Sequence, residues 1–103
     1  MQGYQLTFIT PQDRRHAGRP LSEWLLQAAR QLGIRGATLL AAAEGYGQHQ
    51  RLHAAHFFEL ADQPVMVLLA LDDDEWQRLS QYLRDEAVEV FYIKTPAEFG
   101  LTG

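Results

Sequence analysis

Cysteine is absent from this sequence of 103 residues, which excludes a disulfide framework and thiolate chemistry. Basic residues are in the minority, because the formal net charge is −4 at pH 7. Nucleic-acid-binding domains usually present a basic face, so we expect no nucleic-acid partner. Long apolar runs are missing too. None approaches the roughly 20 residues that a membrane-spanning helix needs, so we expect no membrane insertion.

What the sequence does contain is typical of a soluble globular protein, with 47% hydrophobic and 21% charged residues. At this length we expect one domain over residues 1–103, with an irregular C-terminal tail over residues 94–103. Residues 1–5 lack the charged segment followed by an apolar segment that a secretory signal would have. We therefore expect a cytoplasmic protein.

Hydrophobic periodicity predicts four strands. Apolar and polar residues alternate from Tyr4 to Phe8, and residues 4–10 are rich in aromatic and β-branched types, so this stretch predicts the first strand. A charged loop is expected to follow the first strand at residues 12–18. The other strands are expected over 36–43, 65–71 and 88–94, and the third should have an earlier part at 57–58.

Two helices are predicted between these strands. Apolar residues at the i, i+3, i+4 and i+7 spacing predict a first helix that begins after Pro20 and ends at Gly33. A second helix is expected after Asp72, because Asp72 and Glu75 have the spacing of a capping box. The acidic run 72–75 is better explained by this helix start than by a metal cluster.

The element order β-α-β-β-α-β predicts an α+β protein with a ferredoxin-like fold. In this fold two helices cover one face of a four-stranded antiparallel sheet. Residues 65–71 are apolar on both alternating faces, which is typical of a strand covered on both sides. A monomer would leave the second, apolar face of the sheet exposed. We therefore expect a closed cyclic oligomer in which the sheets face inward.

The densest polar chemistry lies in residues 44–56, between the second and third predicted strands. Gly45 and Gly47 flank Tyr46 and can let a ligand approach the backbone closely, although the same pattern also makes a simple bend. Arg51 carries a fixed fork of donors suited to carboxylate or phosphate. If the protein has a binding site, we expect it on or beside this loop.

Three histidines in the same loop leave metal binding open as an alternative. His49, His53 and His56 would share one face of a helix, and neutral imidazoles bind transition metals. In an extended strand His56 would point away from the other two. Carboxylate support is limited to Glu44 and Glu59. Solvated loop histidines are therefore the favoured interpretation, although copies of one histidine could meet on the axis of a trimer.

No pattern in the sequence indicates catalysis. A Gly-x-Ser-x-Gly elbow is absent, and Ser22 and Ser80 fall in the predicted helices without a histidine nearby in the sequence. Paired carboxylates that would flank a cleft are not identifiable. We therefore expect a protein that is not an enzyme.

Three separated segments, residues 13–21, 36–40 and 44–53, together resemble the PII-like family catalogued as domain of unknown function 190. This family is related to the nitrogen regulatory PII signalling proteins. The resemblance implies a homotrimeric regulatory protein with a ferredoxin-like fold. It also implies that an adenine nucleotide or a similar small anion binds between subunits, and that the loop after the second strand contacts a regulated partner.

The resemblance carries over particular residues and partners. ADP, AMP or ATP is the implied ligand, and no cofactor is required. A membrane transporter or channel is one candidate for the regulated partner. A second, alternative resemblance is to the cation-tolerance proteins, which are metal-binding trimers of the same topology. The residues carried over to the nucleotide-binding site are Glu44, Gly45, Tyr46, Gly47, Arg51, His53 and Arg19.

The sequence departs from the PII pattern in one place that matters for phosphate binding. PII proteins have a glycine-rich basic loop before their last strand, whereas residues 84–87 here are acidic and contain no glycine. The loop after the second strand also looks short for the modifiable loop of the nitrogen-control proteins. A nucleotide with fewer phosphates, or one held by Arg51 and the arginines of residues 14–19, remains compatible with the sequence.

Overall fold

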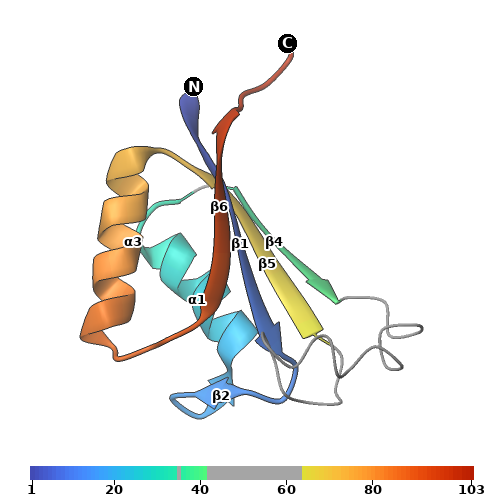
Figure 1. The fold of residues 1–103 in the computed structure, drawn as a ribbon, viewed down its shortest axis with the longest axis vertical. Coiled ribbons are helices and arrows are strands. Elements are labelled where there is room, and N and C mark those ends of the chain that lie inside the picture. Colours follow the sequence, from blue (N-terminus) through green and yellow to red (C-terminus); the bar gives the residue numbers. More distant parts are fainter. Residues whose placement is uncertain (35, 42–63) are drawn as a thin grey trace.

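The computed structural model describes residues 1–34, 36–41 and 64–103. Four of the strands form one antiparallel sheet in the order β4-β5-β1-β6. Figure 1 shows both helices on the same side of this sheet. The elements are β1 (Gln2–Pro11), β2 (Arg15–His16), β3 (Arg19–Pro20), α1 (Leu21–Gln31), β4 (Gly36–Ala41), β5 (Pro64–Leu71), α3 (Asp73–Asp85) and β6 (Phe91–Glu98). The predicted α+β fold with two helices and a four-stranded antiparallel sheet is confirmed.

The core lies between the sheet and the two helices. Alternate residues of the central strand β1 are buried on the helix side, and Leu6 and Phe8 pair there with Leu69 and Val67 of β5. Burying a side chain of this size stabilises the fold by about 1.5–3 kcal/mol. The helices complete this core with Leu21, Leu25, Ala28 and Ala29 of α1 and with Leu79 and Leu83 of α3.

Helix α1 begins and ends as the sequence predicts. Pro20 occupies its N-cap position, and Leu32 is the C-cap. Gly33 follows with φ of 81°, a left-handed conformation that glycine adopts without a steric penalty. The backbone N–H of Ile34 then donates to the Ala29 carbonyl at 3.0 Å, which closes the helix end before β4 begins.

Helix α3 begins with the predicted capping box. The Asp72 carboxylate accepts from the Glu75 N–H, and the Glu75 carboxylate accepts from the Asp72 N–H, both at 2.8 Å. Each bond satisfies a backbone donor that would otherwise lack a partner at the helix start. The reciprocal pair fixes the turn between β5 and α3.

Replacing Asp72 by alanine should therefore lower the free energy of unfolding by about 1 kcal/mol, as is typical for loss of an N-cap side chain. Urea unfolding at one fixed protein concentration measures this loss. Asp74→Ala is the matched control, because Asp74 is an exposed acidic residue in the same helical turn. Equal losses in the two variants would contradict a specific role for the capping box.

The prediction of an irregular tail over residues 94–103 is wrong for residues 94–98. Strand β6 continues to Glu98, which pairs with Gln2 of β1. Pro96 is compatible with this pairing because β6 lies at the edge of the sheet, where a proline is tolerated. Beyond the strand, the Phe99 N–H donates to the Met1 carbonyl at 2.9 Å. The sequence did not indicate this extension because proline usually argues against a strand.

Residues 12–18, predicted as a loop, contain part of a short hairpin. Strands β2 and β3 pair through Arg15 with Pro20 and through His16 with Arg19. The turn between them places Ala17 at φ of 54° and Gly18 at φ of 80°. Pairs of left-handed residues are typical of tight hairpin turns. The hairpin therefore depends on local turn geometry that an alanine does not indicate in a sequence.

The face of the sheet opposite the helices is apolar and open in the described residues. The register places Leu40 of β4 beside Met66 of β5, and Ile9 of β1 beside Met66 on its other side. Leu40 and Ile93 are 43% and 47% exposed.

No helix in the described part of the chain is long and apolar enough to span a membrane.

Candidate functional site

Most of the predicted site residues lie outside the described residues. These are Glu44, Gly45, Tyr46, Gly47, Arg51 and His53, together with His49 and His56 of the alternative metal site. The predicted strand residues 42–43 and 57–58 fall there as well. Only Arg19 of the predicted nucleotide-binding set is placed, on strand β3. The structure therefore shows the elements around the candidate site.

Those elements meet at one end of the sheet. Ala41, the last described residue before the loop, pairs with Val65, and Pro64 pairs with Pro11 at the end of β1. The β2–β3 hairpin follows β1 directly, and Figure 1 shows it at the same end of the sheet as the end of β4. The hairpin and the end of β4 therefore lie at the same end of the sheet (Figure 1).

Within the hairpin, the arginines have different partners. The Arg15 guanidinium donates to the Gly18 carbonyl at 2.7 Å and so holds the turn. The Arg14 backbone carbonyl accepts from the Leu21 N–H at 2.8 Å and joins the hairpin to α1. The Arg19 side chain is exposed and has no hydrogen-bond or ion-pair partner among the described residues. Of the two exposed arginines, Arg15 is held by the turn, so the Arg19 guanidinium is the more available to an anionic ligand.

The segment in place of a basic phosphate loop touches the hairpin. His16 Nε2 lies 3.4 Å from Glu86 Oε1, in the turn after α3. The His16 ring also contacts the Trp24 ring edge-on at 4.6 Å, and Trp24 stacks on Tyr82 at 5.5 Å. Because of the contact between His16 and Glu86, a protonated His16 would partly neutralise the Glu86 carboxylate. This surface ion pair would be worth at most about 1 kcal/mol.

Sequence reasoning missed this contact between His16 and Glu86. The two residues are 70 positions apart, and neither belongs to a local motif that requires the other. The turn that places Glu86 was not indicated either, because Ala87 adopts φ of 57° after it and an alanine does not indicate a left-handed residue in a sequence. Arg84 and Asp85 bond to Gln81 at 3.0 and 2.8 Å, so they stay on the helix surface.

A metal site is not formed by the described residues. Within residues 1–34, 36–41 and 64–103, no group of three or more histidine, aspartate or glutamate side chains is placed to hold a metal ion. The three loop histidines of the alternative lie elsewhere in the chain, so the metal alternative stays a prediction.

Among the solved structures to which the chain is similar in fold are the following two. The chain is similar to CPII from Thiomonas intermedia K12, in a structure bound to ADP, AMP and acetate. The TM-score is 0.64 at 18% identity, over 97% of this chain and 90% of that chain. It is also similar to a PII-like signaling protein from Thermus thermophilus. There the TM-score is 0.59 at 16% identity, over 94% of this chain and 87% of that chain.

The chain belongs to the DUF190 family, described as "Uncharacterized ACR", whose model matches residues 3–96. A relative from Aquifex aeolicus (strain VF5), described as a UPF0166 protein, is 27% identical over 99 aligned residues. The match covers 85% of this chain and 92% of the relative. The predicted family resemblance is therefore confirmed.

Proposed function

We propose that this protein is a PII-like regulator that binds an adenine nucleotide, or a similar small anionic metabolite, between the subunits of a homotrimer. The observation that carries the proposal is the fold, which matches a CPII structure bound to ADP and AMP along nearly the whole chain. The loop after β4 is the element that ligand binding orders for contact with a regulated partner. A ligand can shift such a loop only through different affinities for its two states.

The proposed site combines the loop with the hairpin at the same end of the sheet. Gly45, Tyr46 and Gly47 form the loop base that approaches the ligand. Arg51 and the exposed guanidinium of Arg19 hold its anionic group, because a guanidinium can donate two parallel hydrogen bonds to phosphate. Glu44 and His53 complete the proposed set.

The first test is isothermal titration calorimetry of the metal-free protein with ATP, ADP, AMP and cyclic AMP. One of these nucleotides should bind, and both Arg51→Ala and Arg19→Ala should weaken its binding roughly tenfold or more. A hydrogen bond to a charged group is worth about 1.5–3 kcal/mol, which corresponds to that loss. Arg30→Ala is the matched control, because Arg30 is an exposed arginine of the last turn of α1, away from the hairpin.

Replacing Glu86 should have the opposite effect on nucleotide affinity in the same titrations. Its carboxylate lies beside the hairpin and repels phosphate, so Glu86→Gln should strengthen nucleotide binding, and more for ATP than for AMP. Glu98→Gln removes the same charge at the other end of the sheet and should change nothing. A folded oligomer that gives no heat with any nucleotide would contradict the proposal. Zinc and copper titrations against the loop histidines would then test the alternative.

A further inference from the structure

The His16 side chain joins the β2–β3 hairpin to the end of α3. Its Nε2 atom lies 3.4 Å from Glu86 Oε1, and 26% of the side chain is exposed. Glu86 is the C-cap residue of α3. The C-terminal end of a helix carries a partial negative charge, so the helix end and the Glu86 carboxylate both favour a charged imidazole. Since histidine is the side chain that changes charge between about pH 5 and 8, His16 can carry a charge that depends on pH.

The same histidine lies directly opposite Arg19. The two residues pair across the hairpin. Side chains of directly opposed residues share a face of a strand pair, with Cβ atoms about 4.5–5.5 Å apart. Arg19 is the hairpin arginine that we propose to hold the anionic group of the ligand. A charged His16 therefore adds a second cation beside that group, whereas a neutral His16 leaves the negative charge of Glu86 uncompensated.

Three elements surround His16, namely the hairpin, α1 and the end of α3. The contact with α1 is made by the Trp24 ring, edge-on at 4.6 Å, which adds no charge. On α3, Arg84 and Asp85 both bond to Gln81. Arg19 and Glu86 are therefore the charged groups that act on His16 most directly. The other charged or titratable groups in the adjoining turns are Asp13, Arg14, Arg15, Glu23 and Tyr82.

We propose that His16 is a proton-linked switch of the anion site at Arg19, which holds the nucleotide more tightly when His16 is charged. The switch rests on the proposed function, because Arg19 must contact the phosphates for it to act. A proton on His16 offsets the charge of Glu86 and places an attractive charge beside the phosphates. Ligand binding and protonation are reciprocal, so a bound phosphate favours the proton on His16 by the same factor. Affinity therefore rises as the pH falls.

The switch acts on the phosphates and not on the base. Its effect should increase with the number of ligand charges, and so should be larger for ATP than for AMP. One charge pair at a protein surface changes an equilibrium constant by up to about fivefold. The expected response is therefore a graded change in affinity across the physiological pH range.

Isothermal titration calorimetry of the full-length protein with ATP, ADP and AMP, at pH 6 and at pH 8, tests this inference. The nucleotide phosphate and the other three histidines can also titrate in this range. His16→Gln cancels these contributions, because its side chain stays neutral while the rest of the system is unchanged. Relative to this variant, the unmodified protein should gain about threefold in affinity between pH 8 and pH 6. His16→Lys carries a permanent charge and should keep the higher affinity at both pH values.

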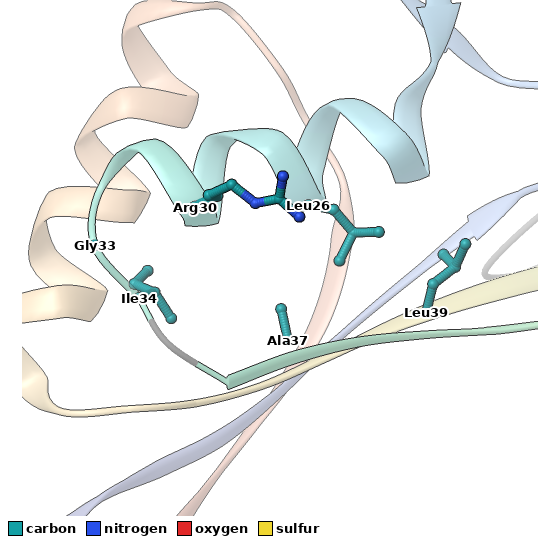
Figure 2. A pocket seen from close by; sticks show the side chains of 6 residues that line it. All are labelled: Leu26, Arg30, Gly33, Ile34, Ala37 and Leu39. Carbon is teal, nitrogen blue, oxygen red and sulfur yellow. The ribbon is translucent and has the colours of Figure 1, made fainter.

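Glu86 sets the pH range in which the switch acts. Its carboxylate favours the proton on His16 with or without ligand, so Glu86→Gln should move the affinity change to lower pH. A series of Kd values from pH 5 to pH 8 measures this displacement. Arg30→Gln is the control for loss of a charge elsewhere. Figure 2 shows Arg30 beside Leu26 on α1, and Arg30 lies nine residues, or about 13.5 Å, along the helix from Leu21, so this variant should keep the pH dependence.

The switch is overturned if His16→Gln shows the same pH dependence as the unmodified protein, or if His16→Lys weakens binding at pH 8. Either result leaves the proposed function intact, because the nucleotide still binds. An unchanged pH range in Glu86→Gln overturns the switch as well, and this exposed substitution remains informative if a His16 variant does not fold. If none of the three nucleotides binds to the folded oligomer, the proposed function fails and the switch fails with it.

Discussion

Replacing Leu40 by glutamate should convert the proposed trimer into monomers. Leu40 lies on the sheet face opposite the helices, beside Met66, and is 43% exposed in the single chain. If three such faces turn inward, each glutamate becomes a carboxylate buried without a counter-ion. Burying an unpaired charge costs several kcal/mol per ion, and a closed trimer repeats that cost in every subunit. A loss of this size exceeds what one substitution usually costs a folded chain.

Light scattering coupled to size-exclusion chromatography measures this change directly. The unmodified protein should elute with about three times the chain mass of 11.7 kDa, and the Leu40→Glu variant should elute near the chain mass itself. Circular dichroism should show that the variant keeps its secondary structure, because Leu40 is outside the buried core.

The adjacent residue provides the control for face and exposure. Leu39 is 42% exposed but pairs with the buried Val67, on the helix side of β4. Leu39→Glu should therefore leave the oligomer intact while Leu40→Glu and Ile93→Glu dissociate it. A monomeric unmodified protein, or a trimer that tolerates Leu40→Glu, would contradict the inward-facing sheets and with them the inter-subunit nucleotide site.

The parts of the fold that the sequence predicted are those with local causes. The capping box depends on two residues three positions apart, and the end of α1 depends on Gly33. The element order then limited the topology to the ferredoxin-like arrangement. The length and register of β6 have no such local cause. Strand β6 is extended by pairing with residues 2–9, which lie at the other end of the chain.

The candidate site was less accessible to prediction for the same reason. The sequence named residues of the loop after β4, which lie outside the described residues, so those assignments stay predictions. It did not indicate that Glu86 would lie 3.4 Å from His16, nor that α1 would leave Leu39 uncovered. Both features depend on how elements from distant parts of the chain are placed. A family resemblance could supply the ligand class, but not these contacts.

The importance of Gly3 is another feature that only the packed structure shows. Gly3 lies in β1 beside Ala97 of β6, and its backbone is not in the left-handed region. A Cβ atom at this position would overlap the Leu71 carbonyl oxygen. It would also lie 2.9 Å from Phe99 Cε1 and 3.0 Å from Asp72 Cα. Two of these three neighbours are backbone atoms, which cannot rotate away as a side chain can.

Gly3→Ala should therefore lower the free energy of unfolding by about 1–3 kcal/mol, the usual cost of overpacking. Urea unfolding measures the loss, and Gly100→Ala is the control, because a Cβ there would meet no atom within 4 Å. A loss within about 0.5 kcal/mol of the control would contradict the close packing of β1 against the β5–α3 junction.

A double-mutant cycle shows which neighbour bears the strain. The Asp72 backbone that a Cβ at Gly3 would push is the same backbone whose N–H donates to Glu75 in the capping box. If Gly3→Ala displaces this turn, the capping box is already weakened, and adding Asp72→Ala should cost less than it does alone. If the losses instead add, the strain falls on Phe99, and the tail should detach from Met1 while α3 keeps its cap. Hydrogen exchange at the Phe99 and Glu75 amides distinguishes the two outcomes, since each amide is protected by the bond in question.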